Sequence, residues 1–77
     1  MNPHIQLKLY ATLKAFMPSQ GEEYPITPGM TVRDLLTQLK LPEDNAKLIF
    51  IDGTQGDVSS KLTGGERVGI FPAVGGG

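Results

Sequence analysis

The sequence has 77 residues, no cysteine, and 7 basic against 8 acidic residues, which gives a formal net charge of −1. This length allows one domain, and the lack of cysteine excludes disulfides, thiolate metal sites and a cysteine nucleophile, as is usual for a cytoplasmic protein. The charges are mixed along the chain, and neither a membrane span nor a signal peptide is visible, so we expect no nucleic-acid or membrane partner.

The first predicted element is a half-buried strand, because apolar and polar residues alternate near the N-terminus. Its apolar side comprises Ile5, Leu7, Leu9 and Ala11. Leu13 and Phe16 continue the apolar content until Pro18. A short second strand is predicted over 23–27, and Pro28-Gly29 ends it.

A helix is predicted next, because the spacing of the apolar residues changes from every second residue to i, i+3, i+4 and i+7. The apolar stripe comprises Val32, Leu35, Leu36 and Leu39. Thr31 is suited to the N-cap, and Asp34 stands at the capping-box position three residues later. Lys40 is expected in the last turn, and Pro42 stops the helix.

The second half of the chain predicts two more strands, over 48–51 and 68–71. Asp52-Gly53 predicts a turn after the first of them, and 54–60 is predicted as a loop above a buried Leu62. Gly64-Gly65 predicts a tight turn, and Pro72 ends the last strand.

The predicted order is strand, strand, helix, strand, strand, and the single amphipathic helix must cover the apolar face of the sheet. This order predicts an α+β fold of the β-grasp type, with a mixed four- to five-stranded sheet and one main helix. The predicted domain spans 1–71, and 72–77 form a flexible, glycine-rich C-terminal tail.

The domain itself offers little chemistry. The only histidine, His4, is expected to be an ordinary exposed side chain. Four carboxylates that might pair already have turn or cap roles: Asp34, Asp44, Asp52 and Asp57. We therefore predict no metal site and no catalytic site within the domain.

The tail that follows Phe71-Pro72 is the unusual feature of the sequence. Three consecutive glycines form a thin thread that can enter a narrow channel of another protein, which leaves the carboxylate of Gly77 as an unhindered reactive group. A carboxylate needs activation, and that step requires a separate nucleotide-binding enzyme. On the tail alone an inert linker explains the glycines equally well, but the tail joins the last strand directly.

Three segments resemble the small sulfur-carrier proteins of the MoaD/ThiS-like family. Residues 49–53 resemble that family's strand followed by Asn-Gly, residues 62–68 its Leu-x-Asp-Gly-Asp-x-Val turn, and residues 70–77 its closing aliphatic-Phe-Pro-Pro-Val-x-Gly-Gly stretch. The last segment is closer to the molybdopterin branch, the small subunit of molybdopterin synthase, than to the thiamin branch. Four residues depart from the family pattern but keep the tail length: Asp52, Gly65, Ala73 and Gly75.

The resemblance implies a ubiquitin-like carrier and not an enzyme. An E1-like adenylyltransferase would use ATP to activate Gly77, a sulfur donor enzyme would convert it to a thiocarboxylate, and the large subunit of molybdopterin synthase or an equivalent acceptor enzyme would receive the sulfur. Gly75 and Gly76 would thread the tail into these enzymes. The partner interface would comprise Phe71, Pro72 and Val74. The carrier itself would bind no cofactor and would be a monomer when alone.

Three alternatives remain open at this point. The acceptor could be a thiazole in thiamin synthesis or another sulfur metabolite. Gly77 could instead be joined to lysines of target proteins, which would make the chain a protein modifier. The chain could also be a non-covalent β-grasp binding module with an inert tail. Separately, the role of Phe71 is open between the partner interface and the core.

Overall fold

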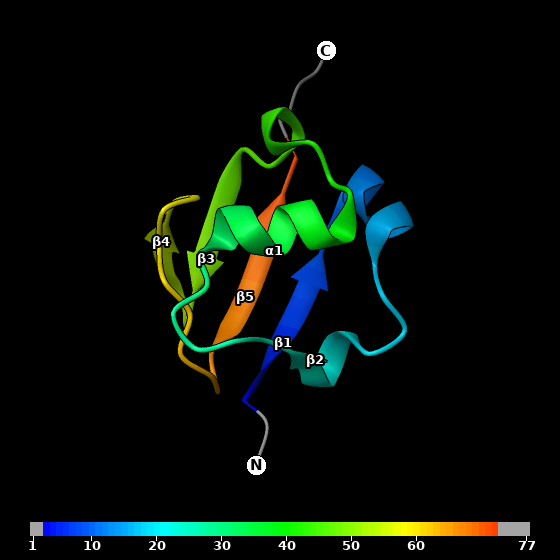
Figure 1. Ribbon diagram of the computed structural model, residues 1–77. Helices are drawn as coiled ribbons and strands as arrows, with labels where there is room; N and C mark the ends of the chain where they lie inside the picture. The colour runs from blue at the N-terminus through cyan, green and yellow to red at the C-terminus, as the bar shows by residue number, and fades with distance from the viewer. Residues whose placement is uncertain (1–2, 73–77) are drawn as a thin grey trace.

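The computed structural model describes residues 3–72, in which a five-stranded mixed sheet is crossed on one face by a single α-helix (Figure 1). The strands lie in the order β2-β1-β5-β3-β4. The α-helix and strands are β1 (His4–Leu9), β2 (Tyr24–Pro25), α1 (Val32–Leu39), β3 (Leu48–Ile51), β4 (Thr54–Gly56) and β5 (Arg67–Phe71). Three short 3-10 helices join them: η1 (Ala11–Phe16), η2 (Gly21–Glu23) and η3 (Glu43–Asn45). The predicted α+β fold is confirmed.

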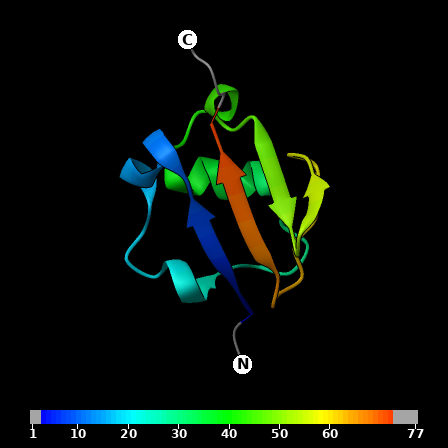
Figure 2. The same ribbon diagram turned by 180° about the vertical axis from the view of Figure 1, so that it is seen from behind.

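The last strand of the described chain, β5, occupies the centre of the sheet, as Figure 2 shows from the side away from the helix. It runs parallel to β1, with Gln6 opposite Arg67 and Leu9 opposite Ile70. On its other side it runs antiparallel to β3. The chain that follows β5 therefore leaves from the middle of one end of the sheet.

The core lies between α1 and the helix-facing side of the sheet. Alternation puts every second strand residue on this side, as the sequence predicts. The strands contribute Ile5, Leu7, Leu9, Ile49, Val68 and Ile70, and the helix contributes Val32, Leu35 and Leu36, all of them buried. The predicted anchor Leu62 is 0% exposed, and Leu39 packs against the core from a partly buried position.

The predicted capping box at the start of α1 is present. The Asp34 amide donates to Thr31 Oγ1 at 3.2 Å, and the Thr31 amide donates to Asp34 Oδ2 at 3.1 Å. The helix ends one residue earlier than expected, because Lys40 adopts the left-handed conformation (φ 59°) and its amide donates to the carbonyl oxygens of Leu36 and Thr37. Lys40 is thus the C-cap and lies outside the last turn.

The first strand is shorter than its apolar pattern suggests. Ala11, predicted on the buried side, is exposed, because its positive φ of 55° ends the extended conformation and starts η1. This 3-10 helix carries Leu13 back into the core. The predicted second strand over 23–27 is reduced to the two residues of β2, Tyr24–Pro25.

The prediction of a loop over 54–60 is wrong for its first three residues. Thr54–Gly56 form β4, which pairs antiparallel with β3. Asp52 and Gly53 make the predicted turn, with positive φ at both residues (53° and 82°), the backbone of a two-residue hairpin. The sequence of this edge strand shows no apolar alternation, because it consists of Thr54, Gln55 and Gly56. Thr54 and Gln55 are both exposed.

The turn before β5 is held by the carboxylate of Glu66. Glu66 Oε2 accepts from the Thr63 amide at 2.9 Å and the Thr63 hydroxyl at 3.1 Å, and Oε1 accepts from the Gly64 amide at 2.8 Å. Partial burial raises the pKa of this carboxyl, but the hydrogen bonds from Thr63 and Gly64 outweigh it, so the pKa of Glu66 is lowered. Gly64 and Gly65 have positive φ, as the predicted tight turn requires.

Replacing Thr31 with alanine removes the acceptor for the Asp34 amide. We expect a loss of about 1 kcal/mol of unfolding free energy, as is usual for an N-cap threonine. Urea denaturation followed by circular dichroism measures it. Thr37→Ala is the matched control, because Thr37 lies exposed within the helix, where alanine is the better helix former. An equal loss in both variants would contradict the cap.

The lowered pKa of Glu66 predicts a pH-dependent contribution to stability. Because the folded pKa lies below the unfolded value of about 4.3, the contribution is present above that value and is lost as pH falls through the folded pKa. Glu66→Gln should therefore lower the Tm at neutral pH, and this effect should shrink progressively as the pH falls below about 4.3. Thermal melts of both proteins across this range test this, and a Tm difference independent of pH would refute it.

Candidate functional site

The end of β5 is fixed to both neighbours up to the point where the tail begins. The Tyr10 amide donates to the Ile70 carbonyl oxygen at 3.1 Å, and the Lys47 amide donates to the Phe71 carbonyl oxygen at 3.0 Å. Phe71 and Pro72 are both half-buried. The other predicted tail residues (Val74, Gly75, Gly76 and Gly77) lie outside the described residues.

The sheet side away from α1, here called the open face, is not covered by another element of the described chain (Figure 2). It carries the strand residues that alternate with the core. β1 and the residue after it contribute Gln6, Lys8 and Tyr10; β5 contributes Arg67, Gly69 and Phe71; β3 contributes Leu48 and Phe50. The strand register places Leu48 opposite Phe71 and Phe50 opposite Gly69.

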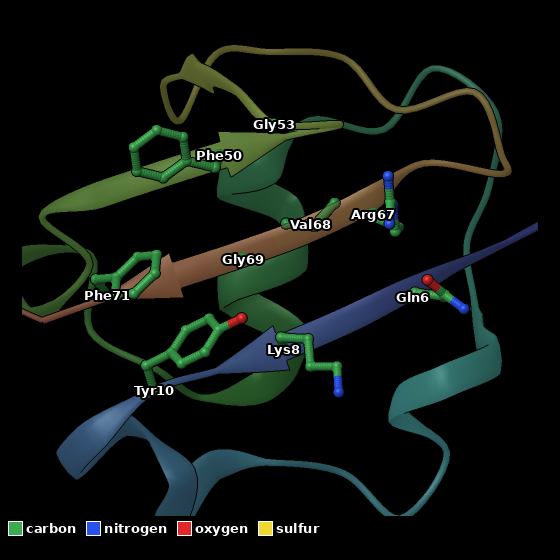
Figure 3. Close-up of a pocket in the computed structure, with 9 residues that line it drawn as sticks. All are labelled: Gln6, Lys8, Tyr10, Phe50, Gly53, Arg67, Val68, Gly69 and Phe71. Carbon is green, nitrogen blue, oxygen red and sulfur yellow. The ribbon is translucent and has the colours of Figure 1, made fainter.

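Three aromatic rings, here called the aromatic cluster, gather on the open face: Tyr10, Phe50 and Phe71 (Figure 3). Tyr10 and Phe71 stack with ring centroids 4.2 Å apart and an interplanar angle of 2°. Phe50 meets Phe71 edge-to-face at 5.9 Å and 85°. Of the two roles that the sequence leaves open for Phe71, the core role does not fit, because its ring lies with this cluster and not among the residues under α1.

The aromatic cluster borders a shallow groove of about 490 Å³. Gly69 leaves the middle of the groove open: a Cβ atom there would lie 3.4 Å from Tyr10 Cε2 and 4.0 Å from Phe71 Cε1. Lys8 lies beside Gly69 on the neighbouring strand, and Gln6 and Arg67 line the groove beyond Gly69, on the side away from Phe71 (Figure 3). The groove therefore has an aromatic end beside the root of the tail and a polar, cationic end.

The two cations of the groove have no acidic partner within the described part of the chain. Lys8 and Arg67 are exposed, and the one ion pair within 4 Å among residues 3–72 joins Arg33 to Glu43. Asp52, which follows β3 on the same side, accepts with Oδ1 from the backbone amide of Arg67 at 3.0 Å and not from its guanidinium.

Residues 3–72 contain no group of three or more His, Cys, Asp or Glu side chains that could hold a metal ion. His4 is exposed, as predicted. None of the helices in this range is long and apolar enough to cross a membrane.

A mixed five-stranded sheet with its last strand at the centre and one helix across one face defines a ubiquitin-like β-grasp protein. The chain belongs to the Mut7-C ubiquitin family, whose profile matches residues 2–75. No curated protein matches the sequence significantly.

Among solved structures, the fold is similar to that of a Pyrococcus furiosus protein assigned as molybdopterin converting factor subunit 1. The TM-score is 0.63 at 24% identity, over 94% of this chain and 99% of that one. The family match and this shared fold confirm the resemblance to the MoaD/ThiS-like proteins that the sequence indicates.

The groove itself was not predicted from the sequence. The alternation that identifies the first strand already puts Lys8 and Tyr10 on the side away from the core. Their meeting with Phe50, Arg67 and Phe71 depends on the strand order and register, which no local pattern encodes.

Replacing Tyr10 with serine removes the ring that stacks on Phe71. We expect a loss of at least about 0.5–1.5 kcal/mol, the usual contribution of an aromatic pair, to which the buried area of the ring adds. Tyr10→Phe keeps the stacking ring and should unfold within a few tenths of a kcal/mol of the wild type on the same scale. Urea denaturation compares the three proteins, and an equal loss in both variants would mean that the stack contributes nothing.

Proposed function

We propose that this protein is a sulfur carrier, active in the cytoplasm, whose working group is the carboxylate of Gly77. The observation that supports this most directly is the position of β5. The last strand is central and pinned through Phe71, so the residues after Pro72 start from a fixed point beside an uncovered aromatic face. A tail that starts from a fixed strand and ends in unbranched glycines is suited to insertion into a narrow channel of another protein.

The chemistry proceeds in two steps, each on a partner enzyme. The α-carboxylate is ionised at neutral pH, since its ordinary pKa is about 3.5. It attacks the α-phosphate of ATP on an E1-like adenylyltransferase, pyrophosphate leaves, and Gly77 becomes an acyl-adenylate. Hydrosulfide supplied by a donor enzyme then attacks the acyl carbon and displaces AMP, which leaves a thiocarboxylate on Gly77.

The carrier then delivers its sulfur in the tail-receiving channel of an acceptor enzyme. The molybdopterin converting factor assignment of the similar structure favours a pterin precursor as acceptor and the large subunit of molybdopterin synthase as partner. Within the tail, Gly75 and Gly76 supply the narrow thread, and Val74 joins Phe71 and Pro72 in the partner interface. The reacting groups other than Gly77 belong to the partner enzymes.

Intact-mass analysis of the protein, after incubation with ATP, a sulfur donor and the host's activating enzyme, tests the proposal. We expect one oxygen to be replaced by sulfur, and fragmentation should assign the change to Gly77. An unchanged mass, with an activating enzyme proven active on another carrier, would favour a non-covalent binding module. Ladders of conjugates with other proteins would favour a protein modifier.

Deleting Gly77 tests whether the tail is needed for sulfur incorporation but not for folding. The variant should lose sulfur incorporation completely and unfold at the same urea concentration as the wild type, because the core lies within residues 5–70. Adding one glycine after Gly77 is the matched control for tail length: it keeps a glycine carboxylate but displaces it. Loss of folding on deletion would contradict the view that the tail is a separate functional arm.

A further inference from the structure

We propose that Met17 is a reversible oxidation site, at which hydrogen peroxide transfers one oxygen atom to the thioether sulfur and thereby releases residues 17–23 from β1. Neither the tail nor the groove of the open face takes part in this reaction. The site is therefore separate from the residues of the proposed function, and its effect is on the stability of the domain.

The methyl end of Met17 fills a notch that Gly21 leaves open beside β1. Met17 Cε occupies the place that a Cβ atom of residue 21 would take, and Met17 Sδ lies 3.6 Å from that place. The carbonyl oxygen of Leu7, in β1, lies 3.2 Å from it. Gly21 is buried although both of its neighbours in the chain are exposed. The Met17 side chain therefore packs the segment that joins η1 to η2 against the edge of the sheet (Figure 1).

The side chain that fills this notch is also open to solvent. Met17 is 36% exposed, whereas Met30, which belongs to the core, is 8% exposed. A hollow of about 480 Å³, lined by residues 17–23, lies beside Met17 and admits a molecule as small as hydrogen peroxide. Because oxidation of sulfur side chains follows their exposure, Met17 reacts while Met30 is protected.

The reaction is the transfer of one oxygen atom. A lone pair of Met17 Sδ attacks one oxygen of hydrogen peroxide, and the O–O bond breaks as the S–O bond forms. The leaving hydroxide takes the proton of the transferred oxygen and departs as water. The sulfur is oxidised by two electrons and the peroxide is reduced by two. Methionine sulfoxide reductases reverse the modification, so the site can return to its reduced state.

A sulfoxide does not fit the notch that the thioether fills. Oxidation converts a flexible apolar side chain into a polar one, and the sulfoxide oxygen is a hydrogen-bond acceptor. The polar atom beside the notch, the Leu7 carbonyl oxygen, is an acceptor as well. Burying the sulfoxide there without a donor is costly, so the oxidised Met17 side chain leaves the notch. This weakens the sheet edge at β2, which follows η2 and pairs with β1 over two residue pairs only.

Limited oxidation of the full chain with hydrogen peroxide, followed by peptide mapping and thermal melts, tests the proposal. In the native protein Met17 should be oxidised at least about tenfold faster than Met30, and the two rates should converge in urea. Oxidation should lower the Tm by about 4–8 °C, the range typical of the loss of one modest contact in a small domain. Treatment with methionine sulfoxide reductase should restore the Tm. Equal rates in the native protein, or oxidation of Met17 without a change in Tm, would overturn the proposal.

Met17→Leu removes the sulfur but keeps an apolar side chain, and Met30→Leu is the matched control, since this exchange nearly conserves volume. Peroxide should leave the Tm of Met17→Leu within about 1 °C of its untreated value, because no oxidisable side chain then fills the notch. Met30→Leu should lose as much as the wild type. A loss in Met17→Leu equal to that of the wild type would assign the damage to another methionine and contradict the proposal.

Gly21→Ala tests the notch itself. The added Cβ takes the place of the Met17 methyl group, so Met17 is displaced before any oxidation. Compared with the wild type, this variant should melt at a lower temperature, react faster with peroxide at Met17 and show no further loss of Tm on oxidation. A folded Gly21→Ala protein with the wild-type rate and the wild-type loss would refute the role of the notch. If the variant does not fold, the comparison of Met17→Leu with Met30→Leu decides the question alone.

Discussion

The parallel pairing of β1 with β5 joins the two ends of the described chain and puts the final strand at the centre of the sheet. A parallel pair cannot be closed by a short hairpin, so all the intervening chain, including α1, must cross over between them. The crossover brings the helix to one side of the sheet only. The core, the uncovered side and the exit of the tail all follow from this one long-range contact.

Successive side chains of β5 point to opposite sides of the sheet, so one set packs in the core and the other lines the groove. Val68 and Ile70 are 0% exposed beneath the helix, whereas Arg67, Gly69 and Phe71 face outward into the groove. Because the two sets occupy opposite sides, residues of the outward set can change with little effect on the core. The same strand that stabilises the domain thereby also fixes the geometry of the groove.

The elements whose signals are local could be predicted from the sequence. The stripe Val32, Leu35 and Leu36 with its Thr31–Asp34 capping box specified α1, and the apolar run at 48–51 specified β3. β4 was missed because it is a polar edge strand held by backbone pairing to β3, which leaves no apolar period to detect. η1 was missed because it depends on a left-handed Ala11, a conformation that alanine rarely adopts. The groove was missed because it is a product of register between three strands distant in the sequence.

Both edges of the sheet are short and poorly suited to pairing with another chain. β2 has two residues, one of them Pro25, which has no amide hydrogen to donate, and β4 has three, of which Thr54 and Gln55 are exposed and polar. Sheet-edge growth, the usual route by which small β proteins aggregate, therefore has little backbone to build on. A domain with such edges can leave the aromatic face of its sheet uncovered while its strands resist joining those of its own copies.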